Sequence, residues 1–251
     1  MCPLCNYLKL PSYENNKLSI THIFAGNTLD RGDHARRDEI ALKRMIRRDN
    51  TKLLPFHNLK PLVKRSPDPE LAWINHEFLD DLPIEAGGPK FLGFDKDQNP
   101  YFAVDVSTVK DPSRIAVIAD NAAFEDGRSA AIDIPPEQSG ILAQARSNLN
   151  WHLQHRFCSF CGSESQSHRG GLMRECPTCK TQHFPRTDPV VIMLVYRGNR
   201  CVMGQTLGRQ SSGFYSCLAG FMDHGESIEE GVRREVMEEA GLPIGKVTYH
   251  S

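Results

Sequence analysis

Three glutamates near the end of the sequence are the residues best suited to carry chemistry. Glu235, Glu238 and Glu239 stand at positions i, i+3 and i+4 of a helix-like stretch, which places their carboxylates side by side. On a helical wheel Glu239 also falls in the apolar sector, between Ile228 and Val232. A buried carboxylate is costly without a cation or strong donors, and neighbouring carboxylates repel one another. A hard divalent cation such as Mg²⁺ would remove both costs, because it prefers oxygen ligands. The alternative interpretation is a solvated acidic face.

The helix that carries these glutamates has clear start and stop signals. Ser227 followed three residues later by Glu230 predicts a capping box, and Gly241 followed by Pro243 predicts the end. The apolar residues recur at every fourth position and should share one buried face: Ile228, Val232, Val236 and Ala240.

Four cysteines in the middle of the chain form a second constellation. They make two Cys-x2-Cys pairs, Cys158 with Cys161 and Cys176 with Cys179. Four thiolates with this spacing can surround Zn²⁺ tetrahedrally, at about 2.3 Å per bond. Because the protein fills all four positions, the zinc should be structural rather than catalytic. A redox dithiol pair is the alternative, and Cys2 and Cys5 near the start are interpreted as incidental thiols.

Composition excludes several classes of protein. The 251 residues have a formal net charge of −1, which argues against a generally basic nucleic-acid binder. The sequence contains no apolar run of the roughly 18 residues that a membrane span needs, and its first residues do not predict a secretory signal. The most basic stretch, roughly residues 36–48, is interpreted as a solvated helix face, with a phosphate-facing or RNA-facing patch as the alternative.

The remaining elements predict a scaffold of helices and strands around these sites. A helix is expected over 36–48, with Ile40, Met45 and Ile46 as its apolar side, and a second helix over 138–153. Segments 91–94 and 101–106 predict a hairpin with a polar loop. Further strands are expected at 20–25, 114–120, 190–196, 200–204 and 215–219, with residues 198–199 as a hairpin turn.

The acidic stretch also resembles a known family. It meets every position of the pattern Gly-x5-Glu-x7-Arg-Glu-(aliphatic)-x-Glu-Glu-x-Gly-(aliphatic), through Gly220, Glu226, Arg234, Glu235, Val236, Glu238, Glu239, Gly241 and Leu242. That pattern is the signature of the Nudix hydrolases. The order of parts resembles the NADH pyrophosphatase branch of that family, on the basis of residues 24–31 with 54–56, residues 151–162 with 176–192, and Ala219-Gly-Phe221.

The resemblance implies a domain organisation and a reaction. The fold class would be α/β: an incomplete Nudix α/β/α sandwich at 187–251, preceded by a mobile terminus at 1–19, an α+β Nudix-like domain at 20–152 and a zinc ribbon at 153–186. The implied reaction is hydrolysis of the pyrophosphate bond of NADH or NAD, giving AMP and nicotinamide mononucleotide, with removal of NAD caps from RNA as a second activity. Members of this branch usually act as homodimers with Mg²⁺ or Mn²⁺.

The same resemblance assigns roles to single residues. Glu235 and Glu239 would bind metal, and Glu238 would share a metal or polarise water. The Ala219 carbonyl would be a further ligand, and Arg234 would pair with Glu226 to hold the loop against the helix. Phe221 would stack on a base and Phe184 would contact substrate, although both phenylalanines have an alternative interpretation as plain core residues.

The sequence departs from the branch at its end. A Ser-Gln-Pro-Trp-Pro motif is expected just after the helix, and the chain ends at Ser251, about where it should begin. We therefore expect a fragment with a missing carboxyl-terminal part. The alternatives to a dinucleotide pyrophosphatase are a Nudix enzyme acting on ADP-ribose or a nucleotide sugar, and a non-catalytic zinc-ribbon interaction protein. The expected compartment is the cytoplasm, with the peroxisome or mitochondrion as alternatives.

Overall fold

The computed structural model describes residues 22–79, 88–113, 115, 122–205 and 215–250. Contacts divide the chain into two units, Met1–Pro185 and Arg186–Ser251, each of which is described by itself. Within the described residues, no helix is both long and apolar enough to cross a membrane.

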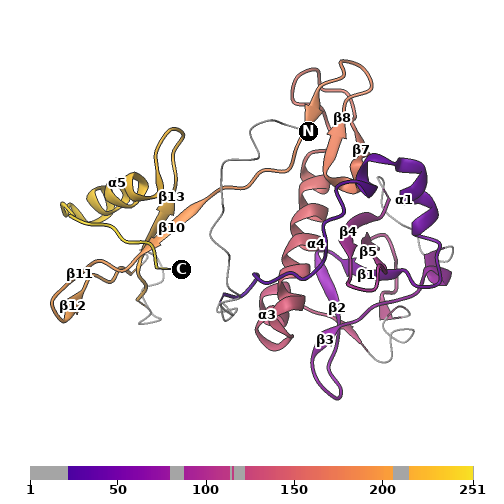
Figure 1. Cartoon of the computed structure of the whole chain (residues 1–251), viewed down its shortest axis with the longest axis horizontal. Coiled ribbons are helices and arrows are strands. Elements are labelled where there is room, and N and C mark those ends of the chain that lie inside the picture. Colours follow the sequence, from indigo (N-terminus) through magenta and orange to yellow (C-terminus); the bar gives the residue numbers. More distant parts are fainter. Residues whose placement is uncertain (1–21, 80–87, 114, 116–121, 206–214, 251) are drawn as a thin grey trace, which may run out of the picture. The chain divides into compact units, whose positions relative to one another are not determined.

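The first unit is built on a mixed sheet (Figure 1). Its strands run in the order β3 (Glu70–Leu71), β2 (Lys60–Lys64), β1 (Lys52–His57), β5 (Pro100–Asp105) and β4 (Lys90–Phe94), and β6 (Ala123–Phe124) also pairs with β2. Strands β1 and β5 are parallel, and β4 pairs antiparallel with β5 as the predicted hairpin.

Alternating side chains of this sheet build two cores. Leu54 and Phe56 of β1 pack with α3 (Gly127–Asp133) and α4 (Pro136–Gln154). Helix α4 includes residues 138–153, where the second helix was predicted. Leu53 of β1 and Phe102 of β5 pack on the opposite face, with Leu42 of α1 (Glu39–Met45). The short helices η2 (Ala35–Arg37) and η3 (His76–Leu79) belong to the same unit.

Two sequence predictions in this unit were wrong. The described part of the expected strand at 20–25 is a turn, in which Phe24 has a φ of 71° and its N–H donates to Ser139 Oγ at 3.1 Å. The expected helix over 36–48 is divided, because the Asp38 carboxylate caps a new helix by accepting from the N–H groups of Ile40 and Ala41. Ile40 is 64% exposed, so Leu42 supplies the buried side instead. The strand expected at 114–120 lies outside the described residues, except for Ile115.

A ribbon of three short strands follows α4: β7 (Gln166–His168), β8 (Met173–Glu175) and β9 (Gln182–His183), with η4 (Arg169–Gly171) between the first two. Arg174 anchors the ribbon to the helix. Its buried guanidinium donates to Ser165 Oγ at 2.8 Å and lies 3.0 Å from Nδ1 of His152. Burial lowers the pKa of His152 to about 3, so the imidazole is neutral and its Nε2 can donate to the Gly171 carbonyl at 2.9 Å.

The second unit is a small α/β arrangement. Strands β10 (Val190–Met193) and β13 (Leu218–Phe221) pair antiparallel, and α5 (Ile228–Ala240) packs on one face of the pair through Val191, Met193, Leu218, Val232 and Val236. Strands β11 (Tyr196–Arg197) and β12 (Arg200–Cys201) form the expected hairpin around Gly198, whose φ is 60°. The mixed α/β class is thus confirmed. The predicted strands at 190–196, 200–204 and 215–219 are shorter than expected or shifted.

Candidate functional site

Helix α5 begins and ends as its sequence predicts. The Ser227 side chain accepts from the Glu230 N–H, and the Glu230 carboxylate accepts from the Ser227 N–H, so the capping box is complete. Gly241 ends the helix with a φ of 65°, in the left-handed region that favours glycine. These caps fix the helix, and with it the direction in which its carboxylates project.

Arg234 organises the carboxylates. Its Nη2 lies 2.7 Å from Oε1 of Glu226, which is the contact expected from the sequence. Its Nη1 donates to Glu235 at 2.9 Å and to Glu238 at 3.1 Å, and its Nη2 also donates to the Phe221 carbonyl at 2.8 Å. One guanidinium therefore joins the loop before the helix, the last residue of β13 and two of the three glutamates.

Glu235 is the most buried of the three glutamates, with a side chain only 12% exposed. Its carboxylate lies directly over Gly220 of β13, since a Cβ built on this glycine would be 1.9 Å from Cδ of Glu235. A close approach of this kind requires glycine at position 220.

The Gly220→Ala substitution should therefore displace the Glu235 carboxylate. We expect it to lower the free energy of unfolding by about 1–3 kcal/mol, as overpacking of a filled site does. Urea denaturation of the variant measures this loss. Gly245→Ala is the matched control, because a Cβ at Gly245 meets nothing within 4 Å. Equal stability of the two variants would contradict the packing described here.

Glu238 and Glu239 are more open to solvent. The Glu238 side chain is 58% exposed and Glu239 is exposed, so the prediction that Glu239 lies in a buried apolar sector was wrong. Ile228 is also exposed. Among the residues that the structure describes, the sheet surface beneath α5 is the β10–β13 pair, which contacts a narrow face of the helix that includes Val232 and Val236. Among the described residues, the cysteines of the ribbon are the one group whose potential ligand atoms already converge as at a metal site.

Arg234 also changes the acid strength of Glu226. Hydrogen bonds from Arg234, then from the Asp223 N–H, lower the pKa of Glu226 from 4.5 to about 2. A carboxyl group whose pKa is lower in the folded state than in the unfolded state stabilises the fold. The full stabilisation is present at pH values above the pKa of the unfolded state. This contribution is lost as the pH falls from about 4.5 towards 2.

We therefore expect the second unit to lose stability between pH 4.5 and pH 2, and the Glu226→Gln variant to lose less across the same window. Thermal unfolding followed at several pH values measures both slopes. Parallel slopes for wild type and variant would contradict the assignment of this acid sensitivity to Glu226.

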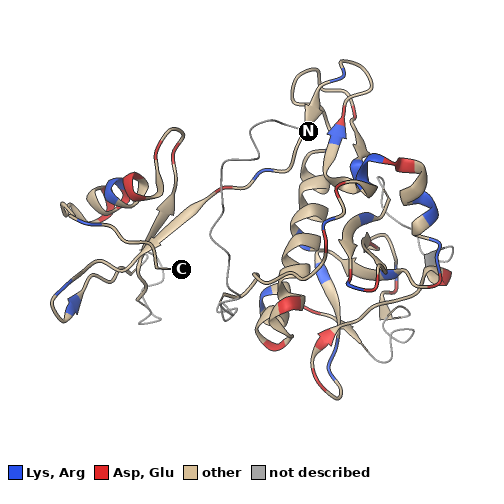
Figure 2. Cartoon of the chain, in the orientation of Figure 1, with Lys and Arg blue, Asp and Glu red and all other residues tan. Residues whose placement is uncertain are grey.

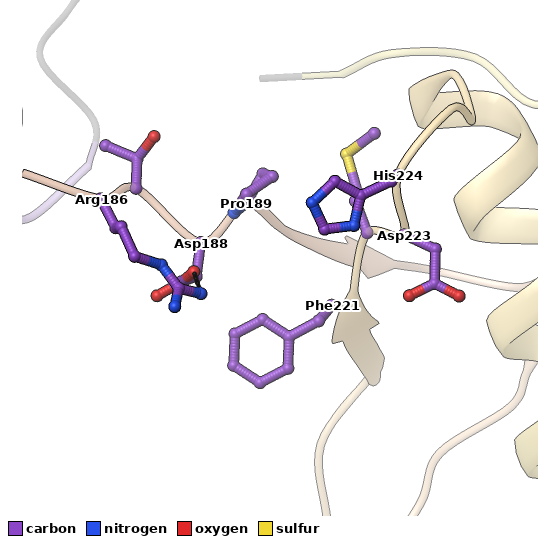
Figure 3. A pocket seen from close by; sticks show the side chains of 8 residues that line it. Arg186, Asp188, Pro189, Phe221, Asp223 and His224 are labelled. Carbon is purple, nitrogen blue, oxygen red and sulfur yellow. Dashed lines mark hydrogen bonds and ion pairs between the residues drawn. The ribbon is translucent and has the colours of Figure 1, made fainter. Parts of the chain in front are cut away.

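A hollow of about 630 Å³ lies beside β13 (Figure 3). It is lined by residues 186–189, which precede β10, and by residues 221–224, which follow β13. The antiparallel pairing of Val190 with Phe221 brings these two segments together.

Phe221 is 64% exposed, so its interpretation as a core residue was wrong. Phe184, in the first unit, is 53% exposed and is likewise not a core residue.

The polar lining of the hollow was missed by sequence reasoning. Arg186 pairs with Asp188 at 2.7 Å, and the other polar residues of the lining are Thr187, Asp223 and His224 (Figure 3). The available signal was the strand pairing, because the start of one antiparallel strand must lie beside the end of its partner. None of Glu235, Glu238 and Glu239 lines the hollow, but Arg234 bonds to the Phe221 carbonyl at its edge.

The four cysteines of the ribbon fit a tetrahedral zinc. Their sulfur atoms all lie within 4.8 Å of one another, with Cys158 and Cys179 at 3.6 Å and Cys161 and Cys176 at 3.4 Å. Four Zn–S bonds of about 2.3 Å would place the sulfurs about 3.8 Å apart. Hydrogen bonding from Thr181 lowers the pKa of Cys179 to about 6, which favours the thiolate that zinc requires.

Fold and site together define a protein of three modules: an amino-terminal α+β domain, a four-cysteine zinc ribbon, and a domain with a capped acidic helix. Each module matches a family profile. Residues 50–151 match the NADH pyrophosphatase-like rudimentary NUDIX domain, residues 153–184 match the NADH pyrophosphatase zinc ribbon domain, and residues 186–251 match the NUDIX domain. The chain belongs to the Nudix hydrolase family, in the branch that contains these three modules.

Curated relatives match most of the chain. The chain is 31% identical to NAD-capped RNA hydrolase NUDT12 of Macaca fascicularis over 97% of its own length. It is 36% identical to the mitochondrial NAD(P)H pyrophosphatase NUDT13 of Mus musculus over 77%, and 29% identical to an NAD-capped RNA hydrolase of Schizosaccharomyces pombe over 92%. The matches span 61%, 59% and 73% of these relatives.

Proposed function

We propose that the chain hydrolyses the pyrophosphate bond of NADH and NAD, releasing AMP and nicotinamide mononucleotide. The observation that carries this proposal is the Arg234 network, which holds two helix carboxylates next to a strand whose last residue opens into the hollow. A carboxylate cluster beside a hollow with an exposed aromatic ring suits a substrate that joins phosphates to planar bases.

The donor set fits hard divalent metal. Glu235 and Glu239 would be ligands of Mg²⁺ or Mn²⁺, with Glu238 sharing a metal or polarising water and the Ala219 carbonyl as a further ligand. A bound divalent metal supplies charge neutralisation at the pyrophosphate oxygens and a more acidic water. Arg234, paired with Glu226, holds the carboxylates of Glu235 and Glu238 in position. The exposed Phe221 ring stacks on a base, and Phe184 contacts substrate.

Removal of NAD caps from RNA is the second proposed activity, because the cap contains the same pyrophosphate bond. It is favoured by the relatives whose names state this activity, which match over nearly the whole chain. We also propose a homodimer, which light scattering tests, and a cytoplasmic location, which fluorescence microscopy of the tagged chain tests against the mitochondrial and peroxisomal alternatives.

The test of the reaction is product analysis. The chain is incubated with NADH and either Mg²⁺, Mn²⁺ or a chelator, and AMP and reduced nicotinamide mononucleotide are measured by chromatography. We expect both products only with metal, and faster turnover than with ADP-ribose or a nucleotide sugar. If the chain prefers ADP-ribose or a nucleotide sugar, that compound replaces NADH as the assigned substrate. If the chain hydrolyses none of these compounds, the proposal that it is an enzyme is overturned.

A further inference from the structure

The end of α1 carries a concentrated positive charge (Figure 2). Lys43, Arg44 and Arg48 are exposed, and none of them makes an ion pair with any residue that the structure describes. We refer to these three residues as the α1 basic face. They are free to meet a ligand from solution.

Two neighbouring arginines, Arg36 and Arg37, are not part of the α1 basic face because they have partners within the protein. Arg36 is buried, donates to the carbonyls of Arg31 and Gly170, and lies over the ring of Phe91. Arg37 pairs with Asp33 at 2.6 Å. The structure thus divides the basic stretch of the sequence into cations with internal partners and cations without them, and only the second group can bind an external anion.

The geometry keeps the three cations together. Backbone bonds from the Arg47 N–H to the Arg44 carbonyl and from the Arg48 N–H to the Met45 carbonyl continue the coil past the end of α1. Arg48 therefore follows Arg44 by four residues in a continuous turn of the backbone, so their like charges repel one another. The helix dipole compensates for Lys43 and Arg44 in the last turn, but Arg48 lies beyond the C-cap residue Ile46. A bound polyanion would remove the repulsion at all three positions.

We propose that the α1 basic face binds the phosphate backbone of the RNA that follows an NAD cap. This inference rests on the proposed function, because it assigns a surface to the RNA body of a substrate whose cap is cleaved elsewhere. With a net charge of −1 the whole chain does not attract nucleic acid, so a local face of this kind is needed. Contacts from lysine and arginine to phosphate carry no sequence preference, which suits an enzyme that acts on many capped RNAs.

The test compares the wild-type chain with the triple variant Lys43→Gln, Arg44→Gln, Arg48→Gln. Binding of a fluorescent 20-nucleotide single-stranded RNA with a 5′ NAD cap is followed by anisotropy, in chelator, from 50 to 200 mM salt. Each phosphate contact to a single strand contributes about 0.7 to the slope of log affinity against log salt. Loss of three contacts should lower the slope by about 2, so over this range wild-type affinity should fall roughly 20-fold more than that of the variant.

A matched control removes three cations from the opposite end of the sheet. Asn50 bonds to Asn99 at the α1 end of β1, whereas the Asn58 N–H bonds to Ser107 at the other end. Lys60 and Lys110 lie near that other end. Arg128 is the second residue of α3, whose first residue, Gly127, lies close to Pro61. The variant Lys60→Gln, Lys110→Gln, Arg128→Gln has the same change in net charge, and we expect it to keep the wild-type salt slope.

Turnover separates this inference from the proposed function. The α1 variant should show a raised KM for capped RNA and unchanged hydrolysis of free NADH. Three results would overturn the RNA assignment while NADH hydrolysis persists. They are a salt slope unchanged in the α1 variant, an equal loss of slope in the control variant, and binding of phosphatidylserine vesicles in place of RNA. A wild-type chain that binds RNA through this face but releases no AMP from NADH would overturn the proposed function instead.

Discussion

Replacing Glu239 with glutamine is expected to abolish metal-dependent release of AMP from NADH. The substitution keeps the size of the side chain and removes the charge that a hard cation requires. Stabilisation of transition-state charge by a metal amounts to several kcal/mol, and each 1.4 kcal/mol is a tenfold change in rate, so we expect a loss of about 100-fold or more. Initial rates at saturating Mg²⁺ or Mn²⁺ measure it. Because Glu239 is exposed and makes no hydrogen bond or ion pair with a residue that the structure describes, the fold should be unaffected.

The matched control is Glu229→Gln, the same substitution at an exposed position in the first turn of the same helix. It should retain the wild-type rate. Titration of Mn²⁺ by electron paramagnetic resonance adds a readout independent of turnover, and the Glu239 variant should bind fewer or weaker ions than the control. Full turnover and wild-type Mn²⁺ binding by the Glu239 variant would refute its role as a ligand.

Local signals predicted the helix of this site, and tertiary contacts decided the environment of its carboxylates. The bounds of α5 follow from Ser227, Glu230 and Gly241, whose effects act within a few residues of the chain. A helical wheel cannot show how wide a surface the helix will cover. The described partner surface is the β10–β13 pair, so Glu239 is exposed rather than buried. A bound cation would therefore relieve repulsion among the glutamates, and it is not needed to offset burial of Glu239.

Arg36 shows a second limit of sequence reasoning. In the sequence it is one more cation of a basic stretch, yet it is buried because Phe91 and the Gly170 carbonyl approach it from distant parts of the chain. Strand β1 was missed as a strand for a related reason. Pro55 lies inside it, and proline normally argues against a strand between two partners. Pairing with β5 and burial of its neighbours on both faces outweigh that local preference.

Cysteine spacing, by contrast, correctly predicted that the four sulfurs of the ribbon come together, and it gives the second large expected effect. The Cys176→Ser variant should lose its zinc and the order of the ribbon. Cys176 is fully buried, and its neighbouring strands are only two or three residues long, too short to be stable on their own. Structural zinc contributes about 10–16 kcal/mol of apparent binding free energy in zinc-finger peptides, so loss of one thiolate should leave the ribbon largely unfolded.

Zinc content by mass spectrometry and hydrogen exchange of residues 158–183 measure this loss directly. Cys201→Ser is the control, because Cys201 is exposed, lies in the second unit and is outside the cluster. It should keep one zinc and wild-type protection. Exchange should also increase around His152, since the buried Arg174 that contacts it belongs to strand β8 of the ribbon. A Cys176 variant that retains zinc and protection at wild-type levels would show that the four sulfurs do not act as one site.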